Sequence, residues 1–454
     1  MGGYPGSAKN MINLFGITIE APGLNAGHYF DELLISVAKK NSERDVLRQF
    51  LTPRISEIIT QAKVESAATE VNDFRPQTVD FYLSQLKSTG VYEKMVLKVI
   101  SSDHQFSSAK TAKDILDGRR PELSSTFPGD HKKAENLVVG SVNSAIGPSE
   151  CREYLTRKTV KTKIQDIAKD LFYAVNHGLS AEQSTRFIGI IYDLDKIKTA
   201  DFTNPIRIKE NIIHSLQTNK PLNLIHIKCL RFTYPYGNRL QLIDHTSDCQ
   251  VPTKLGTIHH PASEVGYFNR LNNIQSVFSN YGVTTNLHIL INDQDLSDYF
   301  PNNTGDGIIP DVDLVNAKTD MDNYHHHLAS IVDGSVKYFR QYLSDHQLLE
   351  KFDSYRLTTL NNLNRGLSVI PENLIESRVN YRYQSNTKIF SVNPGRQFAR
   401  QRVYAQLASL QALSVLGRDD ILVESAKGEE ARLIGGYKTG ALPVIFTKLF
   451  DHVS

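Results

Sequence analysis

The chain has little of what marks several large protein classes. Its 454 residues include three cysteines, Cys151, Cys229 and Cys249. They are odd in number and widely spaced, so they form neither a disulfide framework nor a zinc ribbon, and a reducing, cytoplasmic setting is expected. No apolar run reaches the roughly 20 residues that a membrane helix needs. The early run "MINLFGITIEA" is broken by Asn13 and Gly16, so a signal peptide is not expected either.

An excess of charge of one sign is also missing. The 51 Lys and Arg residues nearly balance the 49 Asp and Glu residues, and the net charge is +2. This balance provides no general attraction to nucleic acid or membrane, so any basic surface must be local. The sequence also lacks Gly-rich phosphate loops, internal repeats and low-complexity tracts. With 40% hydrophobic and 22% charged residues, it is typical of a globular protein with two or three packed units.

The first half of the chain is predicted to be helical. We expect residues 1–10 to be a Gly/Ser/Pro-rich flexible leader, residues 11–125 a helical region, and residues 126–218 a second helical region. Apolar residues in "SERDVLRQFLTPRISEIITQA" follow helical spacing on both sides of Pro53. This proline is expected to kink or end the helix there.

One run in the second helical region has two interpretations. The letters "IIYDLD" look like the strand and aspartate that open a phosphohydrolase site. However, Ser180 and Gln183 form a capping box, and the apolar residues that follow recur at helical spacing. The run is therefore predicted to be helical, with Asp193 and Asp195 as exposed charges.

From about residue 219 the pattern changes to strands that alternate with helices. The runs "PLNLIHIKCLRF" and "VTTNLHILIN" are typical of buried parallel strands, and "EVGYFNRLNNIQSVFSNYG" between them is typical of a helix. Further strands are expected at "RLQLIDH", "DILVESA", "ARLIGG" and "LPVIF", with a mostly helical insertion at about 311–376. A strand, a helix and a second strand in succession imply a crossover and a parallel sheet. The predicted fold class is therefore α/β, with a Rossmann-like, mainly parallel sheet in residues 219–454.

Polar residues at the predicted strand ends define one candidate surface. In open parallel sheets, ligands bind beyond the carboxyl ends of the strands. That rule selects Lys228, Arg231, Asp244, His245, Asp293, Asp295, Glu424 and Lys427.

The stretch that follows the "DILVESA" strand has the highest density of candidates. We expect Glu424, Lys427 and Lys228 to be catalytic, since a carboxylate and a nearby lysine can act as general base and electrostatic stabiliser. Arg231, Glu429 and Lys438 are expected to bind substrate or phosphate. The alternative is a hairpin whose charges face water.

Asp293-Gln294-Asp295 has the form of the aspartate-x-aspartate element of glycosyltransferases. Two carboxylates so spaced after a strand can hold a divalent ion that bridges a nucleotide diphosphate. The alternative is a solvated turn that caps the next helix. The consecutive residues His325 to His327 fan out around a helix and do not suit one metal ion. The sequence indicates no other metal site, and it does not identify a cofactor.

A basic segment, residues 378–418, is the most unusual local feature. It contains no aspartate or glutamate. Its cations are Arg378, Arg382, Lys388, Arg396, Arg400, Arg402 and Arg418. In a nearly neutral protein such an excess marks a surface suited to phosphate, on a small ligand or on RNA. Several of these arginines crowd a helix's first turns, where the dipole disfavours cations, so an anion nearby is expected. The alternative is a solvated basic face.

The order of elements over roughly residues 220–446 resembles the isocyanide synthase and dityrosine/pyoverdine-type biosynthesis family. The likeness lies in "IHIKCLRF", "YGVTTNLHILINDQDLSDYF", the arginine-rich helix and a late glycine-bearing strand pair. The Pro- and Lys-rich turn of that family is replaced here by "KCLRFTYPYG". The resemblance implies amino-acid-modifying chemistry with a sugar-phosphate cosubstrate. The same features also look like tRNA-dependent cyclodipeptide synthases, which implies an aminoacyl-tRNA substrate.

The expected function is a biosynthetic synthase or transferase that acts on an amino acid or aminoacyl substrate. Its partner would be a phosphate-bearing small molecule or tRNA, and not a membrane. A tRNA-dependent cyclodipeptide synthase, a divalent-metal-dependent glycosyltransferase and a non-enzymatic RNA- or protein-binding module remain alternatives. The oligomeric state is not predicted.

Overall fold

The computed structural model describes most of the chain. The described ranges are 11–20, 27–119, 128–197, 205–228, 231–233, 241–243, 257–258, 261–293, 311–367, 371–389, 395–417, 419–425 and 444–447. The chain divides into two compact units, Met1–Tyr173 and Ala174–Ser454. The boundary falls inside the predicted second helical region. Of the helices in these ranges, none is both long and apolar enough to cross a membrane.

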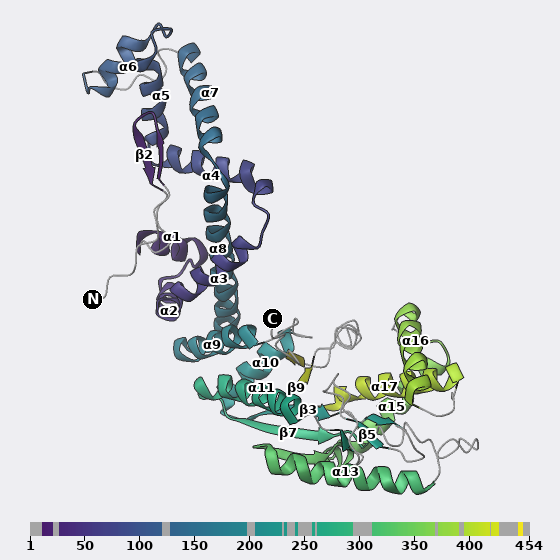
Figure 1. The fold of residues 1–454 in the computed structure, drawn as a ribbon. Coiled ribbons are helices and arrows are strands. Elements are labelled where there is room, and N and C mark those ends of the chain that lie inside the picture. The colour runs from purple at the N-terminus through teal and green to yellow at the C-terminus, as the bar shows by residue number, and fades with distance from the viewer. Residues whose placement is uncertain are drawn as a thin grey trace. The chain divides into compact units, whose positions relative to one another are not determined.

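The first unit is mainly helical, as predicted (Figure 1). Its helices are α1 (Gly27–Val37), α2 (Asn41–Leu51), α3 (Ile55–Ala67), the short η1 (Asn72–Phe74), α4 (Arg75–Ser88), α5 (Val91–Ser102), α6 (Ala109–Leu116), α7 (Pro128–Ala145) and most of α8 (Pro148–Asn176). The break predicted at Pro53 is confirmed, since α2 ends at Leu51 and α3 begins at Ile55. Apolar side chains of α4 to α8 form the core, including Tyr82, Met95 and Val138.

A β-hairpin at the start of this unit was not predicted. Strands β1 (Met11–Leu14) and β2 (Ile17–Glu20) pair in an antiparallel register. The two turn residues, Phe15 and Gly16, both have positive φ, at 55° and 69°. Two successive left-handed residues make the tight turn that matches the twist of paired strands. Gly16, which breaks an apolar run in the sequence, is therefore part of the turn of the hairpin.

The second unit begins with helices α9 (Ala181–Ile197) and α10 (Pro205–Thr218). The capping box is confirmed: the Ser180 N–H donates to Gln183 Oε1 at 3.1 Å, and the Gln183 N–H donates to Ser180 Oγ at 3.2 Å. The "IIYDLD" run is therefore helical, as predicted. Asp193 is not a simple exposed charge, because it is half-buried and accepts a hydrogen bond of 2.7 Å from the hydroxyl of Tyr281.

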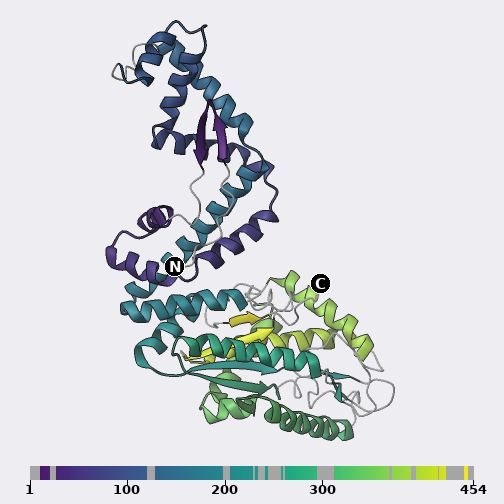
Figure 2. The same cartoon turned by 60° about the vertical axis from the view of Figure 1, so that its left-hand side comes forward.

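A five-stranded, all-parallel sheet lies at the centre of the second unit, which confirms the predicted fold class (Figure 2). Its strands are β3 (Leu222–Lys228), β7 (Thr285–Ile291), β8 (Ser335–Tyr338), β9 (Asp420–Ser425) and β10 (Val444–Thr447). They lie side by side in the order β10-β9-β3-β7-β8. Counted along the chain and read from the β8 edge, this order is 3-2-1-4-5, as in Rossmann folds.

Helices connect these strands. They are α11 (Pro261–Asn280) between β3 and β7, α13 (Asp311–Ile331) between β7 and β8, and then α14 (Phe339–Asp345), α15 (Leu349–Asn364), α16 (Glu372–Ile389), α17 (Gly395–Ala412) and the short η3 (Leu413–Val415) before β9. The segment predicted as a mostly helical insertion therefore also contributes strand β8. This strand lies at the sheet edge and is only four residues long, so the polar–apolar alternation of its letters "SVKY" is too short to mark a strand by itself.

One predicted strand, and the end of another, do not join the parallel sheet. The apolar run "PLNLIHIKCLRF" contains β3 and, after it, β4 (Arg231–Thr233). Strand β4 forms a separate three-stranded sheet with β5 (Gln241–Ile243), from the run "RLQLIDH", and β6 (Thr257–Ile258). The run "ARLIGG" lies outside the described residues.

One face of the parallel sheet is covered by the helices that follow β8. The cluster contains Ile225, Ile227, Leu290 and Leu422 from the strands, and Phe339, Tyr342, Leu343, Phe352, Ala412, Leu413 and Val415 from α14, α15, α17 and η3. Helix α10 contacts β3 and β9, and α11 contacts β7. The central strands are thus buried between helices, and their free ends are the places where polar side chains can meet a ligand.

His288 of β7 is a half-buried base on the face that carries this cluster. Its ring lies 5.2 Å from the ring of Tyr342, and its Nδ1 has no hydrogen-bond partner among the described residues. Burial lowers the pKa of His288, and nearby His346 and Lys337 lower it further, against the opposite effect of Asp420. The folded state therefore disfavours the protonated ring.

As pH falls below the ordinary histidine pKa of about 6.5, this ring becomes protonated in the unfolded chain but stays neutral in the folded chain, where its pKa is lower. We therefore expect the free energy of unfolding to decrease as pH falls over this range. His288→Phe should reduce the drop in the free energy of unfolding between pH 7.5 and pH 5.5, measured in urea. The same change at exposed His326 on α13 is the control. An equal drop in parent and variant would contradict the prediction.

Candidate functional site

The point where the strand order reverses lies between β3 and β9. These two neighbours pair in parallel through Asn223–Asp420, Leu224–Ile421 and Ile225–Leu422. Lys228 is the last residue of β3, and Glu424 is the last but one of β9. Two predicted catalytic residues therefore come at the carboxyl ends of adjacent strands, where open α/β sheets bind ligands. The side chains of Lys228 and Glu424 lie outside what the structure describes, so only their places in the strands are shown. Lys427, Glu429 and Lys438 lie wholly outside the described residues, as do Asp244, His245 and Asp295.

Polar groups at the amino ends of the strands fix this pairing. We define the amino-edge row as the side chains of Asn211, Asn223, Asn286 and Asp420. The Asp420 carboxylate accepts hydrogen bonds from Asn223 Nδ2 at 2.8 Å and from the Gly417 N–H at 2.6 Å.

The rest of the amino-edge row extends to the flanking elements. Asn223 Oδ1 accepts from Asn286 Nδ2 at 3.1 Å, and Asn211 Nδ2 of α10 donates to the Asp420 carbonyl at 3.1 Å. The Asn223 N–H donates to the Asp419 carbonyl at 2.7 Å. Because these bonds join α10, β9, β3 and β7, they hold the register that brings Lys228 and Glu424 to the same edge.

His226 also spans the seam between β3 and β9. Its side chain is buried, and Nδ1 lies 2.9 Å from the carbonyl oxygen of Val423. A carbonyl can only accept, so Nδ1 carries the hydrogen. His226 was not among the predicted site residues, although a histidine inside the apolar run "NLIHIK" is a detectable signal.

Asp293, which follows β7, is held by the protein itself. Its Oδ1 accepts a hydrogen bond of 3.0 Å from the Arg340 N–H, in the first turn of α14. Burial raises the pKa of the Asp293 carboxyl, against the lowering effect of that hydrogen bond. One oxygen of Asp293 thus accepts an N–H at the start of α14. The alternative interpretation of this stretch expected a cap on the helix that comes next in the sequence, which α14 is not. The described residues contain no group of three or more His, Cys, Asp or Glu side chains that could hold a metal ion.

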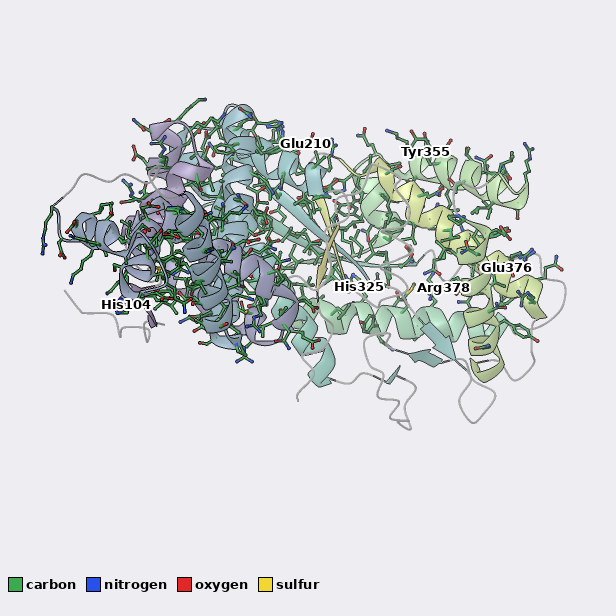
Figure 3. All side chains as sticks on the ribbon, turned by 90° about the horizontal axis from the view of Figure 1, so that it is seen from above. His104, Glu210, His325, Tyr355, Glu376 and Arg378 are labelled. Atoms are coloured by element: carbon green, nitrogen blue, oxygen red, sulfur yellow. The ribbon has the colours of Figure 1, made fainter. Side chains whose placement is uncertain are left out.

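A tyrosine and a histidine lie at the carboxyl end of β8. The Tyr338 hydroxyl donates to the carboxylate of Asp322 on α13, and burial together with Asp322 raises the pKa of this hydroxyl. The ring of His325, labelled in Figure 3, stacks on that of Tyr338, with 5.1 Å between centroids, and its Nε2 lies 3.2 Å from the Val336 carbonyl oxygen. His326 is exposed instead. Tyr338 is therefore a fixed hydrogen-bond donor that sequence reasoning missed.

The basic segment is divided by the structure. Arg378 of α16 and Arg402 of α17 are buried, with 5% and 7% of their surface exposed. Arg396 and Arg400 of α17 contact the carboxylate of Glu376 on α16. The side chains of Arg382, Lys388 and Arg418 lie outside the described residues, as does that of Arg231. Glu376 comes two residues before the segment, so the charge count made from the sequence did not include it.

No protein-family model, curated protein or solved structure matches this chain. The resemblances to isocyanide synthases and cyclodipeptide synthases therefore remain predictions. The strand order, the residues at the strand ends and the divided basic segment are the features that bear on function.

Proposed function

We propose that this chain is a transferase or synthase that binds a phosphate-bearing cosubstrate at the β3–β9 switch point. The observation that supports this most is the strand order β10-β9-β3-β7-β8, because the crevice where such an order reverses is where Rossmann folds bind nucleotides. This step rests on fold-level analogy. An amino acid or aminoacyl second substrate follows from the family resemblance.

Lys228 and Glu424 carry the chemistry in this proposal. The ammonium of a lysine at the end of β3 suits a phosphate or the negative charge that develops in a transition state. A carboxylate near the end of the adjacent strand suits a general base that removes a proton from the attacking group. Asp293 and Tyr338, at the ends of β7 and β8, border the same edge.

Two observations favour a small cosubstrate over the alternatives. Asp293 already accepts the Arg340 N–H, so one oxygen of the carboxylate pair proposed for a glycosyltransferase metal is engaged. A tRNA ligand needs an extended basic surface. With Arg378 and Arg402 buried, and Arg396 and Arg400 bound to Glu376, the basic segment provides less of such a surface than its charge count indicates.

Mass spectrometry of material that co-purifies with the full chain tests the proposal. It distinguishes bound tRNA from a bound phosphate-bearing metabolite, and the metabolite then serves as the substrate for assays. We expect Glu424→Gln to reduce turnover about a hundredfold or more, with the melting temperature nearly unchanged. Lys228→Met should weaken binding of the phosphate-bearing compound.

Glu350, exposed on α15, is the control: Glu350→Gln should leave both activity and melting temperature at the parent's values. If activity survives in Glu424→Gln while stability falls, Glu424 only supports the sheet. If the Lys228 and Glu424 variants both bind and turn over substrate as the parent does, the switch point is not the site.

A further inference from the structure

Two guanidinium groups hold one carboxylate between α16 and α17. Arg396 and Arg400 are one helical turn apart, so they project from the same face of α17. Arg396 Nη2 lies 2.5 Å from Glu376 Oε2, and Arg400 Nη2 contacts the other oxygen, Oε1. Arg396 Nη1 also donates to Asn380 Oδ1 at 2.5 Å. Figure 3 shows the position of Glu376 on α16.

The charges in this cluster do not balance. Two guanidinium groups face one carboxylate, which leaves an excess of one positive charge. The arginines lower the pKa of the Glu376 carboxyl, so it remains ionised at neutral pH. The side chains of Arg396, Arg400 and Glu376 are 50%, 42% and 27% exposed, so solvent and ligands can reach them. Ion pairs with this much exposure contribute little to stability, so Glu376 can be exchanged for another anion at small cost.

We propose that Arg396 and Arg400 form a binding site for a phosphate monoester, and that Glu376 occupies this site until the ligand displaces it. The inference rests on the proposed function, since it assumes that the protein binds a phosphate-bearing cosubstrate. It adds that this cosubstrate is a phosphate monoester. Two convergent guanidinium groups provide paired donors for the oxygens of a single anionic group, the arrangement in which arginine binds carboxylate and phosphate most strongly.

The charge of the ligand decides which class displaces Glu376. A terminal phosphate monoester carries nearly two negative charges above its second pKa of about 6, so it neutralises both guanidinium groups. A phosphodiester in a nucleic-acid backbone carries one negative charge, as the carboxylate does, and gains nothing by the exchange. The site therefore selects a small molecule with a terminal phosphate over an RNA backbone.

The test measures binding of two probes to the full chain by isothermal titration calorimetry. Glycerol 3-phosphate is the monoester, and dimethyl phosphate is the diester. Glu376→Gln, which keeps the side-chain shape and removes the competing charge, should bind the monoester about tenfold more tightly than the parent does. The double variant Arg396→Gln/Arg400→Gln should bind it about tenfold more weakly. The diester should bind weakly to all three proteins.

A second ion pair in the same unit provides the matched control. Arg340 makes a bidentate pair with Asp353, with distances of 2.9 and 2.8 Å, and one guanidinium is present there instead of two. Asp353→Asn should therefore leave monoester affinity at the parent's value. Arg396→Lys/Arg400→Lys keeps both charges but loses the planar donors, and should give an intermediate affinity. Because both positive charges beside Glu376 remain, this variant keeps the ion pairs between α16 and α17. A loss of affinity in it is therefore due to the lost guanidinium donors and not to a disturbed contact between the helices.

Several results would overturn the inference. They are equal monoester affinity in Glu376→Gln and the parent, unchanged binding in the double glutamine variant, equal affinity for monoester and diester, or no monoester binding to any variant. If Lys228→Met alone abolishes monoester binding, the switch-point function stands and the arginine site falls. If the arginine and Glu376 variants behave as expected while Lys228→Met and Glu424→Gln match the parent, the arginine site stands and the switch-point function falls.

Discussion

Gly189→Ala is expected to lower the free energy of unfolding of the second unit by about 3 kcal/mol. Gly189 is buried in α9, and the ring of Tyr281 lies directly on it. A methyl group there would be 2.2 Å from Tyr281 Cε1 and 2.5 Å from Cζ, closer than real contacts allow. The ring must move, which breaks the hydrogen bond of 2.7 Å from its hydroxyl to Asp193.

The turn that carries Tyr281 has little freedom to yield. Arg186, one turn before Gly189 on α9, donates from Nε to the Tyr281 carbonyl at 2.6 Å and from Nη2 to the Gly282 carbonyl at 2.7 Å. These bonds satisfy carbonyl groups just beyond the end of α11, which has no further helical N–H to supply them. Displacing Tyr281 therefore disturbs the whole α9–α11 contact and not one side chain.

Thermal and urea unfolding of the parent and variant measure the effect. Gly140 of α7 is the matched control, because it is also a helical glycine but nothing lies within 4 Å of the methyl group it would gain. Gly140→Ala should be neutral or stabilising by up to about 1 kcal/mol, from helix propensity alone. In a protein that already carries Tyr281→Ala, adding Gly189→Ala should lower the free energy of unfolding much less, because the ring that the new methyl group would meet is gone. A parent-like melting temperature for Gly189→Ala would contradict the prediction.

Asp420→Leu is expected to destabilise the sheet by about 2 to 3 kcal/mol, since it leaves two part-buried donors without their acceptor at about 1 kcal/mol or somewhat more each. The donors are Asn223 Nδ2 and the Gly417 N–H, which the Asp420 carboxylate accepts at 2.8 and 2.6 Å. Asp420→Asn keeps the shape and one acceptor oxygen, and should cost less than half as much. Urea unfolding provides the measurement, with hydrogen exchange of β3 and β9 to locate the loss.

The neighbouring residue Asp419 is the control. Its carboxylate lies 3.7 Å from His214 Nε2 in a partly exposed pair, so Asp419→Asn should change stability by less than about 1 kcal/mol. A double-mutant cycle of Asp420→Ala and Asn223→Ala should show coupling of about 1 kcal/mol or more. If the two single effects add without coupling, the bond between these side chains does not hold the register.

The fold class was predictable because three central strands carry local patterns. The apolar runs of β3, β7 and β9 are short, are bounded by polar or turn residues, and alternate with helices of clear period. The order of the strands was not predictable. It places Asn223 opposite Asp420, 197 residues away, and no local pattern encodes which strand pairs with which.

The positions of two candidate residues were predictable for the same reason. The rule that ligands bind beyond strand ends needs only the strand positions, and Lys228 and Glu424 do lie at the carboxyl ends of β3 and β9, while their role in a site stays a prediction. Glu376 was missed because its effect depends on the contact between α16 and α17, and the charge count began at Arg378. Tyr338 was missed because β8 has only four residues, so the short alternation in "SVKY" does not stand out within a segment predicted to be mostly helical.

The position of β3 in the middle of the sheet also affects how the protein is made. Its partner β7 is synthesised soon after it, whereas β9 begins only at Asp420, 197 residues after Asn223. At about 5–20 residues per second, the ribosome needs on the order of ten seconds or more to supply that second partner. During this interval one apolar edge of β3 has unpaired backbone groups, which can template pairing with another chain. This topology therefore makes the nascent chain vulnerable to aggregation until β9 leaves the ribosome.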